Sequence, residues 1–218
     1  MTKSFFEYLR EAKKVKQRSF DHWWDENHNE HLSSDNDLDE VSSRLSKGRK
    51  LKPRHEEAIE QYTSNYNKPL NRNLIQNKPL STKHQKIAND LDDAIARNPF
   101  RKKATVYSRL SFDPREHVDE KSTMSSPSYL STTHSKMEAA SFSSTVQNPK
   151  TKKKEWHFMQ LRLKPGDPAV HIGDKSVQPD ERETLVGRNT RLRLRKTETF
   201  ADTDGITKHI HHMEVHNE

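Results

Sequence analysis

The chain has 218 residues, and its 39 Lys and Arg against 32 Asp and Glu give it a formal net charge of +7 at pH 7. Because it contains no cysteine, disulfides, thiol nucleophiles and cysteine-ligated zinc or iron–sulfur sites are excluded. Only 29% of the residues are hydrophobic and the mean hydropathy is −1.19. We therefore expect a compact core with a poorly ordered extension rather than a wholly folded chain.

The amino-terminal residues 1–50 are predicted to lie outside the folded domain. Residues 3–18 are predicted to form a short amphipathic helix with two phenylalanines and a leucine on one side. Residues 19–50 are polar and predicted to be mostly linker or disorder. The pair Trp23 and Trp24 either folds back on the domain, the preferred interpretation, or anchors a partner. The sequence has no apolar run that could cross a bilayer and no secretory signal, so we expect a cytoplasmic protein.

Helices are predicted from residue 53 onward. Residues 53–80 contain one helix and a second, shorter one interrupted by prolines. Residues 81–99 contain the clearest helix, which begins with the capping-box pair Thr82 and Gln85 and ends at an Asn-Pro. Its apolar face recurs every four residues and consists of Ile87, Leu91 and Ile95.

The second half of the chain is typical of strands. Strands are expected at residues 104–112, 127–133, 155–163, 168–172, 190–196 and 205–218, with a brief helix at 134–144. Helices come first and strands follow, so residues 51–218 are predicted to form a single α+β domain rather than an alternating parallel fold.

Three motifs follow one another along this half of the chain. Arg109 lies on the first strand, Ser131-Thr132-Thr133 lies on a second, and Glu181-x-Glu183 enters a later strand after a loop. In this order they resemble the arginine–serine–glutamate class of mono-ADP-ribosyltransferases, and the resemblance covers residues 53–218. It implies a helical lead-in followed by a mainly antiparallel two-sheet core. It also implies transfer of ADP-ribose from NAD⁺ to a protein with release of nicotinamide, without a metal.

The resemblance also implies a role for each motif. Glu183 is the carboxylate that holds the nicotinamide ribose and favours its developing positive charge, and Arg109 binds the NAD⁺ diphosphate. Ser131 positions Glu183 and the ribose, and Thr132 supports this strand and the dinucleotide. Glu181 implies an arginine acceptor, because members that modify arginine carry Glu at that position. The arginine strand reads Tyr-Ser-Arg where the family has Tyr-Arg-Gly, so its register decides where the guanidinium points.

The first residues are similar to the capsid-targeting peptides of internal head proteins in large tailed phages. Those peptides are cut after Leu/Ile-x-Glu, a pattern that Leu9-Arg10-Glu11 and Leu38-Asp39-Glu40 match. This resemblance implies removal of residues 1–11 or 1–40, packaging in a phage head, and injection into the host cytoplasm. The acceptor would then be a host transcription or translation protein, and we expect the enzyme to be a monomer.

Two other features allow different interpretations. His209 and His211 share one face of the last strand and could bind a metal, although a solvent-exposed face is the preferred interpretation. The basic segments at residues 148–156 and 191–196 could contact phosphates. The alternatives to a protein-modifying enzyme are therefore a basic, non-catalytic nucleic-acid-binding virion protein and an ADP-ribosyltransferase that acts on nucleic acid.

Overall fold

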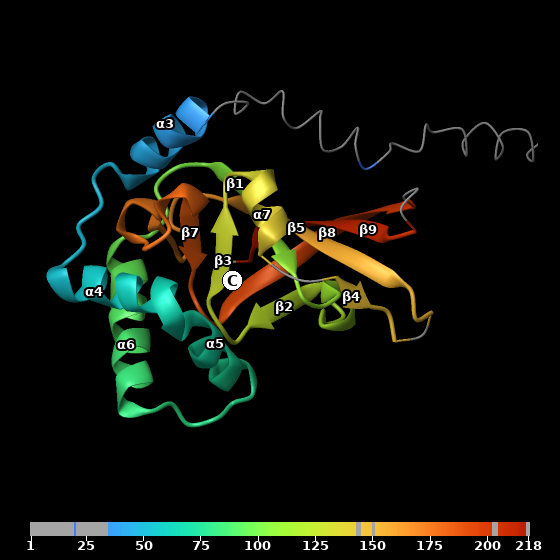
Figure 1. Cartoon of the computed structure of the whole chain (residues 1–218), viewed down its shortest axis with the longest axis horizontal. Helices are drawn as coiled ribbons and strands as arrows, with labels where there is room; N and C mark the ends of the chain where they lie inside the picture. Colours follow the sequence, from blue (N-terminus) through green and yellow to red (C-terminus); the bar gives the residue numbers. More distant parts are fainter. Residues whose placement is uncertain (1–19, 21–34, 143–144, 150, 202–204, 217–218) are drawn as a thin grey trace, which may run out of the picture.

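The computed structural model describes Phe20 and residues 35–142, 145–149, 151–201 and 205–216. The predicted helix at 3–18, the Trp23–Trp24 pair and the Leu9-Arg10-Glu11 motif lie outside the described residues. Helices α4, α5 and α6 occupy one side of the molecule, and the long strands β5, β8 and β9 extend to the other (Figure 1). No helix in the described part of the chain is long and apolar enough to cross a membrane.

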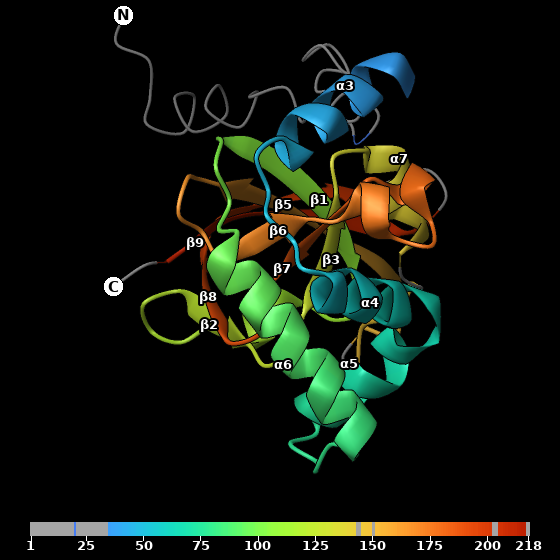
Figure 2. The same cartoon turned by 90° about the vertical axis from the view of Figure 1, so that its left-hand side faces the viewer.

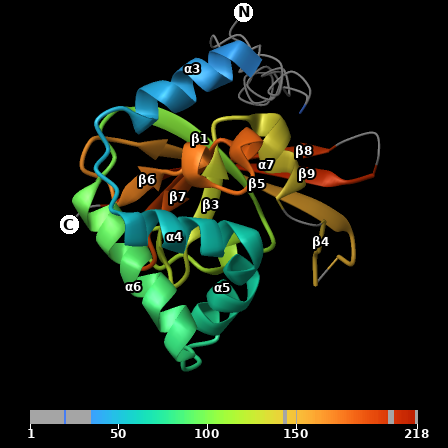
Figure 3. The ribbon, with the colours of Figure 1, turned by 60° about the vertical axis from the view of Figure 1, so that its left-hand side comes forward.

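Residues 35–46, predicted to be linker, form helix α3 (Asp35–Ser46) instead. Its apolar side is narrow: Leu38 is buried, and Leu45 packs against the sheet core. Because so few apolar residues line this side, the sequence of α3 shows no clear helical repeat of apolar positions, and the helix was not predicted. Figure 3 shows α3 lying across the domain above β1 and β6.

The region 53–80 forms the two predicted helices as one nearly continuous run. Helix α4 (Pro53–Gln61) passes through a π-helical turn (Tyr62–Tyr66) into α5 (Asn67–Ile75). Pro69 falls in the first turn of α5, where a proline is tolerated. The π-helical turn contributes the fully buried Tyr62 to the core.

Helix α6 (Thr82–Arg97) confirms the clearest prediction. The N-cap is Ser81, whose hydroxyl accepts a hydrogen bond from the His84 backbone N–H at 3.2 Å, so the predicted capping role of Thr82 is wrong by one residue. The predicted apolar face is buried and packs against Tyr62 and Leu70 of the preceding helices. Figure 2 shows α4, α5 and α6 together in front of the sheet.

Nine strands follow within the described residues, and they confirm the α+β class. They are β1 (Ala104–Leu110), β2 (Thr123–Ser126), β3 (Leu130–Thr133), β4 (Val146–Gln147), β5 (Lys154–Leu163), β6 (Ala169–His171), β7 (Glu183–Val186), β8 (Thr190–Ala201) and β9 (Thr207–Val215). The predicted short helix is α7 (Lys136–Ser141). Strands β2 and β4 were not predicted, because both are short.

The strands form one hydrogen-bonded sheet in the order β2-β8-β9-β5-β1-β3-β7-β6, with β4 paired to β5. All pairings are antiparallel except that of β5 with β9, as expected of a mainly antiparallel core. The expected two sheets are joined, because β1 and β3 meet through the pair Tyr107 and Thr133. This narrow junction lies where the candidate site is built.

Candidate active site

A cleft of about 620 Å³ opens beside the junction of β1 and β3. Its lining comes from the π-helical turn, α5, β1, β3 and the segment that enters β7. Four residues singled out in the sequence are among those that line it: Arg109, Ser131, Glu181 and Glu183. Segments separated by more than seventy positions thus meet around one space large enough for a dinucleotide-sized ligand.

Strand register explains why these side chains meet. Tyr107 pairs with Thr133, and Thr133 pairs with Glu183. Directly opposite residues of antiparallel strands point to the same face, and so do residues two apart on one strand. Arg109, Ser131 and Glu183 therefore share a face, and the extra residue before Arg109 does not turn its guanidinium away from the cleft.

Glu183 begins β7 and is only 3% exposed. Burial raises the pKa of its carboxyl to about 7, a hydrogen-bond contribution from the Ser131 hydroxyl lowers it, and the charge of Glu181 raises it. The buried Tyr62 lies close enough for the Glu183 charge to raise the pKa of its phenol, after burial itself, which has the larger effect. Near neutral pH, Glu183 can therefore lose or bind a proton readily.

The raised pKa of Glu183 predicts a pH-dependent stability. The folded state holds this proton more tightly than an unfolded chain with a Glu pKa of 4.5. Stability from the neutral carboxyl is therefore present below pH 4.5 and is lost as the pH rises through about 7. We expect wild type, but not Glu183→Gln, to lose up to about 3 kcal/mol of unfolding free energy from this group between pH 4.5 and pH 8. Urea unfolding of both proteins across this range measures it, and parallel pH profiles would contradict the burial of an ionisable carboxyl.

Glu181 lies half-buried at the end of a 3₁₀ turn (Pro179–Glu181), and its pKa is raised by burial and by the charge of Glu138. The intervening Arg182 adopts a left-handed backbone with φ 46°, which is uncommon for a residue with a side chain. Its buried guanidinium donates from Nε to Asp39 Oδ1 of α3 at 2.8 Å. The ion pair helps hold this turn, and with it the spacing between Glu181 and Glu183.

Further contacts fasten α3 and the chain after it to the same region. The Arg49 guanidinium donates to both oxygens of Asp174 at 2.7 Å, and the Ser42 hydroxyl lies 2.6 Å from His171 Nε2. Asp174 precedes the turn of Glu181, and His171 is on the neighbouring β6. Residues 39–49, outside the predicted domain at 51–218, thus contact the segment that carries the two glutamates.

Arg109 stacks on Trp156 of β5, with its guanidinium carbon 4.2 Å from the ring centroid. The side chain donates to the Ala140 carbonyl at 2.9 Å and to the Thr145 hydroxyl at 3.3 Å. The Trp156 indole also donates to the Thr145 hydroxyl, at 3.0 Å. These contacts hold the guanidinium against the floor formed by β5 while the residue lines the cleft.

The structure separates Thr132 from the other predicted residues. Thr132 is fully buried and does not belong to the cleft lining. Its hydroxyl donates to the Thr184 carbonyl on β7 at 2.6 Å. The predicted support of the strand agrees with this contact, but direct contact with a dinucleotide does not, because the side chain alternates to the face opposite Ser131.

Sequence reasoning missed two aromatic residues near the site, Tyr62 and Trp156. Tyr62 accepts a hydrogen bond from Asn71 Nδ2 at 2.9 Å, and its phenol also interacts with Ser131 and with the Glu183 charge. Trp156 contacts Arg109 because β1 and β5 pair with Arg109 opposite Phe158. Trp156 lies two residues before Phe158, on the same face of β5. The sequence alone could not identify it, because its contact with Arg109 depends on the register of β1 with β5.

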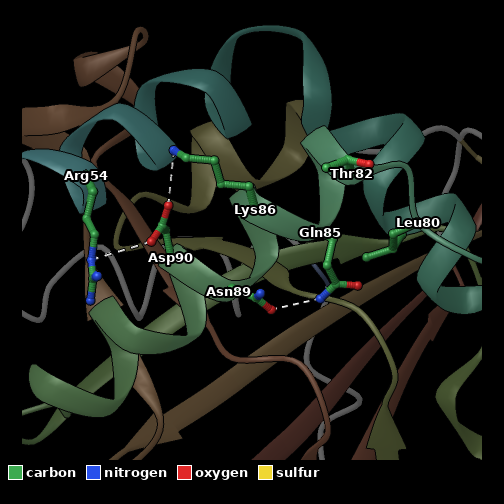
Figure 4. A pocket seen from close by; sticks show the side chains of 7 residues that line it. All are labelled: Arg54, Leu80, Thr82, Gln85, Lys86, Asn89 and Asp90. Atoms are coloured by element: carbon green, nitrogen blue, oxygen red, sulfur yellow. Dashed lines mark hydrogen bonds and ion pairs between the residues drawn. The ribbon is translucent and has the colours of Figure 1, made fainter.

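A second hollow, of about 670 Å³, lies on the outer surface of α6 (Figure 4). Its charged side chains pair with one another: Arg54 lies 3.5 Å from Asp90, and Lys86 lies 3.4 Å from the same carboxylate. None of the predicted site residues lines it. Each of its two cations also has a second carboxylate, Asp93 at 2.6 Å for Arg54 and Glu57 at 3.7 Å for Lys86. Although this hollow is slightly larger, the cleft is therefore the better candidate.

The polar atoms of the cleft fit NAD⁺. Within the described residues, Arg109 Nε, Glu183 Oε1 and Asn71 Oδ1 are buried and have no hydrogen-bond partner. Buried polar groups are normally satisfied, and each exception is worth explaining. NAD⁺ offers phosphate oxygens that would accept from a guanidinium, and ribose hydroxyls and an amide that would donate to the two oxygens.

Comparison with known proteins gives the family. The family model described as ADP-ribosyltransferase exoenzyme matches residues 39–217. No curated protein sequence matches the chain.

Solved structures share the fold. Plx2a, an ADP-ribosyltransferase toxin from Paenibacillus larvae, has a TM-score of 0.64 at 15% identity, covering 84% of this chain and 96% of its own. The ADP-ribosyltransferase Vis in complex with agmatine has a TM-score of 0.62 at 17% identity, and the match covers 84% of this chain and 86% of Vis. C3stau2 from S. aureus with NAD has a TM-score of 0.60 at 18% identity, and the match covers 86% of this chain and 96% of C3stau2. Because the family model matches most of its length, the chain belongs to the ADP-ribosyltransferase exoenzyme family, whose members are enzymes that transfer ADP-ribose from the substrate NAD⁺.

Proposed function

We propose that the protein is a mono-ADP-ribosyltransferase that moves ADP-ribose from NAD⁺ to an arginine side chain of a host protein and releases nicotinamide. The observation that carries this proposal is the presence of two carboxylates, Glu181 and Glu183, on one cleft with Arg109 and Ser131. Glu181 suits the acceptor and Glu183 suits the donor sugar. Arg109 suits the diphosphate of NAD⁺, and Ser131 suits the ribose.

In the donor half-reaction, the bond between nicotinamide and ribose breaks and nicotinamide leaves as a neutral base with the bonding electrons. No general acid is needed, because the leaving group is already a cationic pyridinium. The ionised Glu183 carboxylate holds the ribose hydroxyl and favours the positive charge that develops on the sugar, as a carboxylate does in glycoside hydrolysis. Ser131 orients Glu183, and Arg109 donates to the diphosphate.

In the acceptor half-reaction, a guanidine nitrogen bonds to the anomeric carbon and loses its proton to Glu181. The pKa of Glu181 is raised by burial, which makes it a stronger base for this step. Its position at the end of an exposed turn allows a protein arginine to approach. Agmatine, a guanidine compound, is bound by the similarly folded Vis.

Glu181→Gln tests the acceptor role. We expect NAD⁺ hydrolysis close to wild type and transfer to agmatine or a protein arginine lowered by about 10²-fold or more, because only the second step needs this base. Asp180→Asn, the exposed carboxylate beside it in the same turn, is the matched control and should alter neither rate. The measurements are nicotinamide release with and without acceptor, and mass spectrometry of the modified residue. Equal loss of hydrolysis and transfer, or label on a residue other than arginine, would contradict the proposal.

Digestion of the labelled product distinguishes the alternative acceptor. The protein is incubated with labelled NAD⁺ and host lysate, and the product is treated with protease or with nuclease. Release of the label by protease supports a protein acceptor. Release by nuclease supports an ADP-ribosyltransferase that acts on nucleic acid, which the basic segments of the chain would attract.

We also propose delivery in a phage head into the host cytoplasm, supported by the Leu9-Arg10-Glu11 motif. Of the two cleavage motifs, Leu38-Asp39-Glu40 lies in α3, and a cut there would remove the Asp39 partner of Arg182. A cut after Glu11 keeps this ion pair, so it is the cut that suits an active enzyme. The mass of the protein recovered from virions tests this: a chain beginning at Ala12 is expected, and one beginning at Val41 would contradict it.

A further inference from the structure

The strands β5 and β9 bring a group of histidines together on the side of the sheet away from Arg109. Their parallel register places His157 opposite His209 and Met159 opposite His211. His157 and His211 are fully buried and His209 is 4% exposed, so the expected solvent-exposed face of the last strand is wrong. Trp156, which contacts Arg109, alternates with His157 and points to the other face.

A carboxylate completes this group. Glu155 is buried on β5, and its Oε2 lies 3.3 Å from His157 Nε2 and 3.7 Å from His209 Nε2. Glu155, His157 and His209 each offer one possible ligand atom, and these atoms all lie within 4.8 Å of one another. In a tetrahedral zinc site, bonds of about 2.0–2.1 Å separate neighbouring ligand atoms by roughly 3.4 Å. The spacing to His157 already matches this value and the spacing to His209 is slightly longer. Because the two rings stack at 9° with their centroids 4.8 Å apart, they must tilt toward each other for both Nε2 atoms to face one ion.

The remaining polar atoms of the three side chains are already held. Glu155 Oε1 accepts from Asn148 Nδ2 at 2.8 Å, and His209 Nδ1 lies 2.9 Å from the Thr199 hydroxyl. His157 Nδ1 lies 3.0 Å from His211 Nε2, and His211 Nδ1 lies 3.0 Å from the Thr197 hydroxyl. Such outer contacts fix the tautomer and ring orientation of metal-binding histidines.

The two Nε2 atoms are the exception. Within the described part of the chain, neither His157 Nε2 nor His209 Nε2 makes a hydrogen bond of good geometry, although both are buried and the Glu155 carboxylate lies 3.3 Å and 3.7 Å from them. Burial lowers the pKa of both imidazoles, that of His209 to about 4. A bound metal ion would supply the partner that these two buried nitrogens lack.

We propose that Glu155, His157 and His209 form a binding site for a divalent transition-metal ion, with Zn²⁺ as the best match. Two imidazoles and one carboxylate suit zinc, whereas Ca²⁺ and Mg²⁺ are bound mainly by oxygen. The ion stabilises the pairing of β5 with β9. It takes no part in the transfer reaction, because the cluster faces away from Arg109 and the cleft.

The surrounding charges bear on this site. Arg115 lies near the histidines and disfavours a cation there, but the Asp113 carboxylate pairs with it at 2.6 Å. Asp113 also lies 3.9 Å from His157 Nδ1 and could form a second set with His157 and His211. In that set, the two imidazole nitrogens already bond to each other, so we assign the ion to the set with free Nε2 atoms.

The test uses the untagged full-length chain after removal of metal by a chelator. Zinc titration is expected to give about one tightly bound ion per chain. The Tm should rise by roughly 5–10 °C at a zinc concentration about a hundredfold above Kd. Co²⁺ should give the visible absorption of a tetrahedral site. A Tm that zinc leaves unchanged, or a purely octahedral Co²⁺ spectrum, would overturn the proposal even if variants fail to fold.

Variants locate the ion. Glu155→Gln and His209→Asn should each weaken zinc binding by about tenfold to a hundredfold or more, since ligands matter at least as much as their outer contacts. The matched control is His212→Asn: His212 is on the same strand but pairs with Glu198 at 2.8 Å. Wild-type affinity in Glu155→Gln and His209→Asn would assign the ion to other histidines and overturn the site.

Discussion

Glu183→Gln is expected to lower nicotinamide release from NAD⁺ by about 10²–10³-fold, the usual cost of removing one preorganised group that stabilises transition-state charge. Glutamine keeps the size of the side chain and can still bond to Ser131, so the cleft should keep its shape. It cannot carry the negative charge that favours the developing positive sugar. The loss should therefore appear in kcat more than in the Kd for NAD⁺.

The pH dependence of the wild-type enzyme follows from the same carboxyl. Because burial raises the pKa of Glu183 to about 7, the active carboxylate increases as the pH rises. The kcat/KM is then expected to climb about tenfold per unit below pH 7 and to level off above it. Glu183→Gln should lose this rise along with most of the activity.

Glu120→Gln is the matched control for this prediction. Glu120 is exposed and does not line the cleft, so the same change there should leave the rate and its pH profile unchanged. Nicotinamide release measured from pH 5 to pH 9 on all three proteins is the experiment. A Glu183→Gln enzyme with wild-type turnover would mean that the charge of this residue is not used.

The sequence predicted those parts of the fold that rest on local patterns. The apolar positions of α6 and the strand-forming run of β1 were correct because spacing along the chain decides which face is buried. Helix α3 was missed because two leucines on one side give little signal. Its docking depends on contacts of Ser46 with Asp174 and of Asp39 with Arg182, more than 120 positions away.

The surroundings of the site depend on strand pairing, which no local pattern reveals. The parallel register of β5 with β9 decides that His157 and His209 face each other, and the antiparallel register of β1 with β5 decides that Trp156 supports Arg109. The order of the three motifs identified the segments that line the cleft. It did not identify Tyr62 or Asn71, which come from a π-helical turn and a helix without a motif.

Arg109→Lys is expected to weaken NAD⁺ binding by about tenfold to a hundredfold, because a hydrogen bond from a charged donor contributes about 1.5–3 kcal/mol. Lysine keeps the positive charge but not the planar fork. It loses the stack on Trp156 and the contacts with Ala140 and Thr145 that hold the guanidinium in place. It also lacks Nε, the buried donor that has no partner among the described residues. Charge alone therefore does not replace this side chain.

Calorimetric titration of NAD⁺ into both proteins measures this effect, with Arg162→Lys as the matched control. Arg162 is an exposed arginine on β5 of the same sheet, so its replacement tests whether any strand arginine contributes by charge. Weaker binding in Arg109→Lys alone, at an unchanged Tm, assigns the loss to the geometry of the fork. Equal affinities in wild type and Arg109→Lys would show that Arg109 does not contact the diphosphate. Equal losses of affinity in both variants would show that Arg109 contributes to NAD⁺ binding only through the general positive charge of the protein.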